Sequence, residues 1–117
     1  MIDHTRLLAW QRAHSVVKTV LDLSDRYWTP RGAAIFDQLK RASLSAQTNI
    51  CEGYARYVSR QKLNHYRIAY GSAVETLDLL VTVRDGNLAP PGLVEPTIAT
   101  AGETCALLLG LIKRLQA

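Results

Sequence analysis

A window without acidic side chains, from Gly53 to Val74, holds the residues of this chain that are best suited to bind an anion. It contains four basic residues and four of the five tyrosines: Arg56, Arg60, Lys62, Arg67, Tyr54, Tyr57, Tyr66 and Tyr70. Basic groups bind phosphates through charge and counterion release, and aromatic rings stack on unpaired bases. Two interpretations stay open. The window is a surface that binds RNA or DNA, or it is a solvated connection whose tyrosines fill a core.

The same residue types offer no constellation for catalysis, and we expect the protein not to be an enzyme. Gly53 is followed by no Gly-Lys-Ser/Thr run that would cradle phosphates. The three histidines have no ligand partner at helical spacing, and no Ser–His–acid set marks a triad. Glu52 and Glu75 suit salt bridges better than acid–base chemistry, because neither has an evident apolar pocket. We therefore expect no metal and no cofactor.

Four segments with apolar residues at intervals of three and four must position these groups. They are separated by three breaks rich in glycine, proline and polar residues, "YWTPRG", "GYARYVS" and "RDGNLAPPG". A spacing near 3.5 residues is typical of helices that pack almost parallel to one another. Four helices with short connections predict an all-α, antiparallel up-down four-helix bundle, formed by residues 1–117 as a single domain.

The periodicity also predicts which residues face the core and where the helices begin. Thr29 is the expected N-cap of the second helix with Pro30 at its first position, and Ser59 is the expected cap of the third. The fourth helix begins at Pro91 or at Pro96, which lacks a backbone donor. The predicted inward stripes are Trp10, Ala13, Val17, Leu21 and Ser24; Ile35, Leu39, Ala42, Ala46, Ile50 and Gly53; Leu63, Tyr66, Tyr70, Ala73, Leu77 and Val81; and Val94, Ile98, Ala101, Cys105, Leu108, Ile112 and Leu115.

Helical spacing places the stretch "SAQTNICEGYAR" in the second half of the second helix. Its wheel puts Gly53 and Tyr57 inward, with Ser45 and Glu52 outward. A glycine on a buried stripe costs about 1 kcal/mol of helix propensity. We therefore expect a neighbouring backbone to approach Gly53 closely, or the helix to end there. The same wheel assigns Tyr66 and Tyr70 to the core and leaves Tyr54 free to reach outward.

Composition sets the broader limits. The chain has 117 residues, with 14 Lys+Arg against 10 Asp+Glu, so its formal charge of +4 is compatible with an anionic partner. Cys51 and Cys105 lack metal or redox spacing, which favours two reduced thiols. The N-terminus has no long apolar segment, and no run approaches eighteen apolar residues. We therefore expect a cytoplasmic protein that does not enter a membrane.

Three segments, "LLAWQRAH", "DQLKRASLSAQTNICEGYAR" and "YRIAYGSAVETLDLL", together carry a family pattern. Its matched positions are Trp10, Gln11, Gln38, Leu39, Lys40, Arg41, Ala42, Ser45, Asn49, Ile50, Glu52, Gly53, Ile68, Ala69, Gly71, Ser72 and Glu75. Over nearly its whole length the chain resembles the small four-helix-bundle proteins encoded in intervening sequences of bacterial large-subunit ribosomal RNA genes. It departs from them at Gln47–Thr48, where a proline is frequent, at Lys62, where an acidic residue is usual, and at Tyr27–Trp28, which replaces Phe-Pro.

The resemblance implies architecture more strongly than activity. Such proteins form homo-oligomeric rings, with a pentamer the expected state. They are similar in fold to the accessory protein of diversity-generating retroelements, which works beside a reverse transcriptase and binds nucleic acid. No enzymatic role is implied. The matched polar and small residues predict a seam within the bundle or between subunits, in which Glu52 approaches Arg67 across the second turn.

Two functions of different classes follow. The first is an accessory factor, a basic ring that holds RNA or DNA near a partner through Arg56, Arg60, Lys62 and Arg67. The second is an oligomeric scaffold that binds an unidentified protein partner and no nucleic acid. For either function, Leu107, Leu109 and Leu111 exceed what one inward stripe needs. We expect part of this surplus to contact another subunit.

Overall fold

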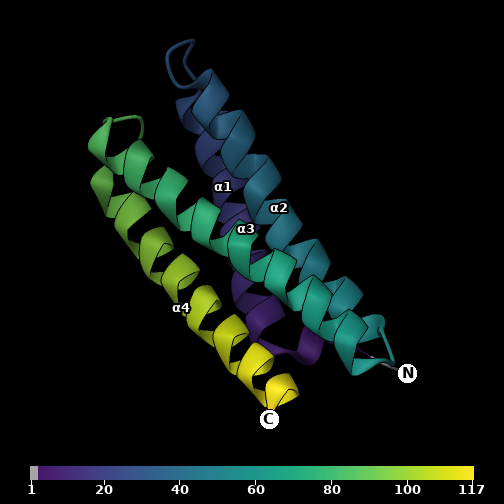
Figure 1. Ribbon diagram of the computed structural model, residues 1–117. Helices are drawn as coiled ribbons and strands as arrows, with labels where there is room; N and C mark the ends of the chain where they lie inside the picture. Colours follow the sequence, from purple (N-terminus) through teal and green to yellow (C-terminus); the bar gives the residue numbers. More distant parts are fainter. Residues whose placement is uncertain (1–2) are drawn as a thin grey trace.

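A short 3-10 turn and four long helices make up the chain in the computed structural model, which describes residues 3–117. The elements, coloured along the sequence in Figure 1, are η1 (His4–Arg6), α1 (Leu8–Tyr27), α2 (Ala33–Ala55), α3 (Ser59–Asp85) and α4 (Pro91–Gln116). Between residues 3 and 117 only helices and turns occur, so the predicted all-α class and the four helices are confirmed.

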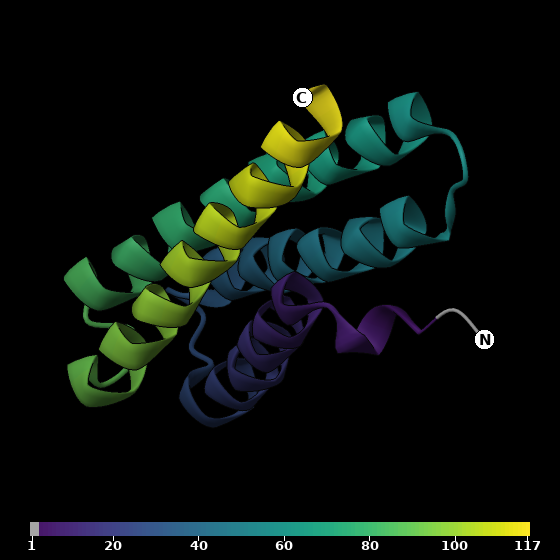
Figure 2. The same cartoon turned by 90° about the horizontal axis from the view of Figure 1, so that it is seen from below.

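Successive helices run in alternate directions, as Figures 1 and 2 show. α2 and α4 each pack on both α1 and α3, which closes the four helices into a bundle of 44 × 24 × 21 Å. An ion pair between Arg12 and Glu103 joins α1 to α4. This topology brings the α2–α3 turn to the same end of the bundle as the start of α1 and the end of α4 (Figure 1).

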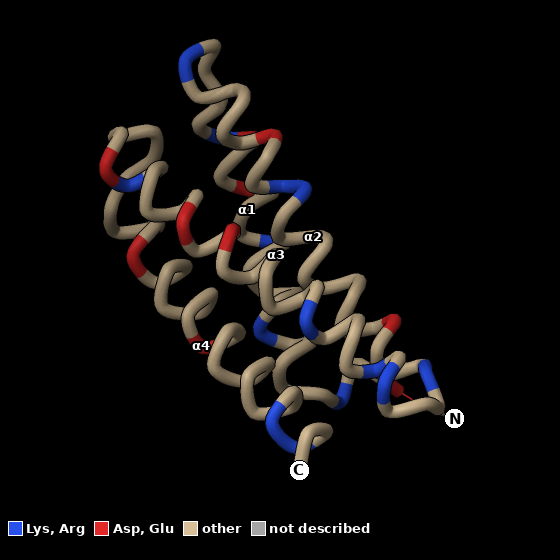
Figure 3. Tube along the Cα trace, viewed as in Figure 1, with Lys and Arg blue, Asp and Glu red and all other residues tan. Residues whose placement is uncertain are grey.

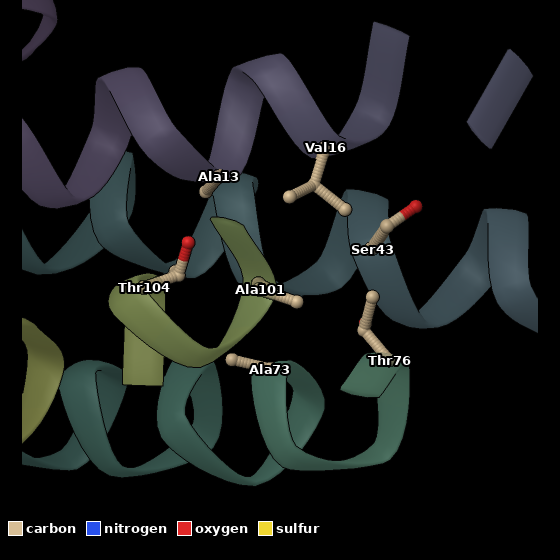
Figure 4. A pocket seen from close by; sticks show the side chains of 8 residues that line it. Ala13, Val16, Ser43, Ala73, Thr76, Ala101 and Thr104 are labelled. Carbon is tan, nitrogen blue, oxygen red and sulfur yellow. The ribbon is translucent and has the colours of Figure 1, made fainter. Parts of the chain in front are cut away.

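The core consists of two apolar clusters that meet at a layer of mostly small residues. Larger side chains such as Phe36 and Leu80 fill one cluster, and Ile50, Tyr66 and Leu108 lie in the other. The layer between them surrounds a void of about 10 Å³ and is formed by Ala13, Val16, Ser43, Ala46, Ala73, Thr76, Ala101 and Thr104 (Figure 4). A void of this size is at the lower limit for one water molecule, so it is a packing feature and not a ligand site.

The inward face of α1 differs from the predicted stripe. Its buried residues are Ala9, Ala13, Val16, Val20, Leu23 and Ser24, whereas Trp10 and Val17 are half-buried and Leu21 is exposed. Ala13 and Ser24 are buried as predicted, but the phase of the stripe was wrong for the other three residues. α1 packs against α2 on one flank and against α4 on the other. The face of α1 that points to the bundle axis, and is buried, therefore lies between these two flanks. The predicted stripe followed the flank toward α2.

Two expected helix starts need correction, and a third is confirmed as one of its two predicted alternatives. α2 begins at Ala33, and Thr29 instead closes the preceding turn, where its carbonyl and its hydroxyl both accept from the Gly32 N–H at 3.1 Å. Ser59 is the first residue of α3 rather than its cap. α4 begins at Pro91, in the first helical position that suits proline, and it continues through Pro96, which removes one helical hydrogen bond, to the Gly92 carbonyl.

Candidate nucleic-acid interface

The α2–α3 turn lies near the beginning of the acid-free window. α2 ends at Ala55 and α3 begins at Ser59, so Arg56, Tyr57 and Val58 connect them. Tyr57 is 89% exposed, which makes its predicted core position wrong. The helical wheel did not apply to it because the helix ends two residues earlier. Tyr66 is buried as expected, and Tyr70 is half-buried against the same cluster.

Lys62 fastens the start of α3 to the end of α2. Its Nζ donates to the carbonyl oxygens of Gly53, at 3.2 Å, and Tyr54, at 2.9 Å. The same ammonium lies 5.6 Å from the centre of the Tyr54 ring, which is half-buried rather than free to reach outward. Carbonyls in the last turn of a helix have no helical partner, and a cation there also offsets the helix dipole. Lys62 therefore has a structural role as a C-terminal cap.

Arg56 is held less firmly. Its guanidinium pairs with the Glu52 carboxylate at 3.0 Å, one helical turn away in the i,i+4 arrangement. Glu52 forms this pair and not the expected contact with Arg67. About half of each side chain is exposed, and such pairs contribute little to stability. A phosphate can therefore replace Glu52 as the partner of Arg56 at small cost.

Arg60 and Arg67 are exposed, and neither has an ion pair or a side-chain hydrogen bond with any residue of the described range 3–117. Together with Arg56 they line an open groove of about 480 Å³ over the first turns of α3. Gln61, Asn64 and His65 supply further polar groups along its walls. The first turn of α3 has no acidic residue, so the positive end of its dipole is not neutralised there. The groove is suited to an anionic ligand.

Three more basic residues lie at the same end of the bundle. Arg6 belongs to η1, and Lys113 and Arg114 belong to the last turn of α4. Figure 3 shows several basic positions toward the end that carries the α2–α3 turn and others along the bundle, while most acidic positions lie toward the other end. We call Arg6, Arg56, Arg60, Arg67, Lys113 and Arg114 the basic end. The sequence analysis missed three of them, because only the antiparallel topology brings the two termini to this turn.

A row of polar contacts joins α2 to α3. Gln38 Nε2 donates to Glu75 Oε2 at 2.6 Å. The hydroxyls of Ser45 and Ser72 lie 2.8 Å apart, so Ser45 faces α3 and its predicted outward position is wrong. Farther along, His65 Nδ1 and Asn49 Oδ1 lie 3.1 Å apart. These pairs place the predicted seam between two helices of one chain, where they fix the register of α2 against α3.

The seam ends at Gly53, which packs against an aromatic ring. A Cβ at Gly53 would lie 2.6 Å from Cε1 of Tyr66, so the close neighbour is this ring and not the expected backbone. The alternative expectation, that the helix ends here, is confirmed, because α2 ends two residues later at Ala55. Burial, and secondarily the neighbouring Tyr54, raises the pKa of the Tyr66 phenol. Gly71, in contrast, has open space where a Cβ would stand.

The remaining motif residues lie apart from the groove. Trp10 stacks on His14 with ring centres 4.6 Å apart and meets His4 edge-on at 5.3 Å. Arg41 is exposed on α2. Neither residue shares the groove at the α2–α3 turn, so the structure does not bring the whole motif together.

Residues 3–117 give little evidence of a metal site, a reactive cysteine or a membrane-spanning helix. That range contains no group of three His, Cys, Asp or Glu side chains able to hold a metal ion. Cys51 and Cys105 are free and half-buried, and burial raises the pKa of the Cys105 thiol, which favours its unreactive protonated form. None of the described helices has the length and apolar character needed to span a bilayer.

A comparison with protein families gives one result. A family model described as 23S rRNA-intervening sequence protein matches residues 5–110. The matched range begins in η1, includes all of α1, α2 and α3, and extends over most of α4. No curated protein matches the chain.

Proposed function

Because the chain belongs to the 23S rRNA-intervening sequence protein family, we propose that it is a non-enzymatic accessory protein that binds RNA or DNA through the basic end. The observation that carries this proposal is the group of basic positions at the end with the α2–α3 turn, where few acidic positions lie (Figure 3). A formal charge of only +4 is enough to attract a polyanion when unpaired arginines gather at one end of the bundle. Phosphate contacts of this kind supply sequence-independent affinity.

Within the basic end, Arg60 and Arg67 are the primary phosphate ligands, because neither has a partner inside the described chain that binding must displace. Arg56 joins them after leaving Glu52. Lys62, which the sequence placed in the same cluster, acts indirectly by holding the turn in position. The four predicted residues therefore differ in how directly they bind phosphate, according to the partner that each already has in the fold.

The proposal includes assembly into a ring of identical chains, most simply a pentamer. The exposed apolar side chains support it, since they include Leu21 and Leu44, which line a groove between α1 and α2, and Val74 and Leu109 on α3 and α4. Of the three leucines expected to be surplus, Leu107 and Leu111 pack against the core and Leu109 is exposed. A ring would repeat the basic end, so individually weak phosphate contacts would add by multivalency. A monomer by light scattering at micromolar concentration would contradict this part.

These exposed apolar residues favour one alternative, a scaffold that binds another protein and no nucleic acid. A pair of charge-matched variants separates the two. Arg60→Gln with Arg67→Gln removes two charges at the groove, and Lys18→Gln with Arg26→Gln removes two on α1, outside the groove.

With a fluorescent RNA oligonucleotide at low salt, we expect the groove pair to lower affinity at least about tenfold, from two lost charge-assisted contacts. The α1 pair should change it by less than about twofold. Equal losses would assign binding to net charge alone. If the unmodified chain binds neither RNA nor DNA, the scaffold takes its place.

A further inference from the structure

Tyr57 occupies a position that the fold does not require. It lies in the three-residue connection between α2 and α3, with Arg56 directly before it, and is 89% exposed. Its neighbour Val58 is 51% exposed, so the turn presents an apolar surface to solvent. The phenol makes no side-chain hydrogen bond within residues 3–117. A single exposed ring is common on protein surfaces, but this one adjoins a second exposed apolar residue and the arginines of the groove, and that combination suits a ligand with both aromatic and anionic groups.

From this placement, and resting on the proposed function, we infer that the α2–α3 turn binds a single-stranded segment of nucleic acid, with one unpaired base stacked on Tyr57. Arg56 and Arg60 flank the ring in sequence, and Arg60 also lines the groove with Arg67. One short stretch of chain thus provides a ring on which a base can stack and guanidinium groups that can bind the adjoining phosphates. This combination is the usual means of holding single strands without reading their sequence.

A duplex does not offer the same contacts. Its bases are already stacked and paired, so their faces are not available to Tyr57, although its phosphates remain available to the arginines. An apolar protein partner would use Tyr57 and Val58, but it gives no reason for arginines before and after Tyr57 in the sequence. The flanking arginines therefore favour a polyanion with exposed aromatic faces. The site should discriminate single strands from duplexes through the ring, and bind both through charge.

The test compares two labelled probes, a fifteen-nucleotide oligouridylate and an RNA duplex of the same length, by fluorescence anisotropy with the full chain. Tyr57→Ala removes the ring, and Tyr57→Phe keeps it. Trp28→Ala serves as the control, since Trp28 is 55% exposed and lies in the α1–α2 turn, at the opposite end of the bundle. Circular dichroism and light scattering verify that each variant is folded and assembled as the parent.

Tyr57→Ala should weaken oligouridylate binding about tenfold and duplex binding less than about twofold, since alanine substitutions of base-stacking residues cause losses of this order. Tyr57→Phe and Trp28→Ala should behave as the parent. Unchanged oligouridylate binding by Tyr57→Ala, or equal losses on both probes, overturns the stacking site. If the Arg60/Arg67 variant then still loses both probes, the proposed function stands without it. If the parent binds neither probe, both proposals fall together.

Discussion

Replacing Gly53 with alanine should destabilise the bundle, although alanine is the better helix former. A glycine-to-alanine change inside a helix gains up to about 1 kcal/mol of propensity. The new Cβ, however, would lie 2.6 Å from Cε1 and 2.7 Å from Cδ1 of Tyr66, and 3.2 Å from Cβ of His65. Carbon atoms pack at about 3.5–4.0 Å, so the ring would have to move by roughly 1 Å. Tyr66 is only 4% exposed and has little space to enter.

Overpacking of this kind costs about 1–3 kcal/mol, which exceeds the gain in propensity. We expect a net loss of about 1 kcal/mol for Gly53→Ala and a larger loss for Gly53→Leu. Gly71→Ala is the matched control, because no atom lies within 4 Å of its Cβ position and only the gain in propensity remains. Urea unfolding at one fixed protein concentration measures both variants, since the proposed assembly would make stability depend on concentration.

The reasoning would be refuted if Gly53→Ala gained as much stability as Gly71→Ala. A second background tests the cause directly. With Tyr66 replaced by alanine the obstructing ring is absent, so adding Gly53→Ala should no longer destabilise. A loss that persists in that background would mean that something other than the ring limits the space at Gly53.

Three further predictions concern the contacts around the turn and the seam. Lys62→Gln should destabilise by about 1 kcal/mol in urea unfolding, because two carbonyls at the end of α2 lose a charged donor. Its RNA affinity, measured by anisotropy, should fall less than that of the groove arginine variants. A larger loss of affinity than theirs, with unchanged stability, would contradict the capping role. Ser45→Ala or Ser72→Ala alone should cost about 1 kcal/mol and the double variant little more than either, so strictly additive losses in a double-mutant cycle would refute their coupling. The raised pKa of Tyr66 keeps its phenol neutral in the fold, so the stability it provides is present below its ordinary pKa of 10.0 and is lost as pH rises through the folded-state pKa. Tyr66→Phe should show a shallower loss of stability across that range, and an identical pH profile by urea unfolding would contradict the shift.

The architecture was largely predictable because helical periodicity is a local property of the sequence. Spacings of three and four residues identified four helices, and the short breaks fixed their order. The phase of a stripe is less local. Both flanks of α1 carry apolar residues, and only the arrangement of α2 and α4 determines that Val16 and Val20 are buried while Leu21 is exposed.

The candidate site was predictable as a composition but not as a surface. The acid-free window identified Arg60 and Arg67, which line the groove. It also treated Lys62 as equivalent to them, because the two carbonyls that it caps become visible only once α2 ends at Ala55. The end of α2 likewise decides that Tyr57 is exposed. Lys113 and Arg114 are distant in sequence, and only the folded topology brings them to the same end.

The salt dependence of RNA binding tests the central claim most directly, because it measures how many phosphates the chain contacts. The logarithm of the binding constant should fall linearly with the logarithm of salt concentration. For single strands each lost contact reduces the slope by about 0.7, so Arg60→Gln with Arg67→Gln should flatten it by about 1.4 per chain engaged. The control pair at Lys18 and Arg26 should leave the slope at the parental value. A groove variant whose slope equals the parent's would contradict the assignment of the basic end as the nucleic-acid surface.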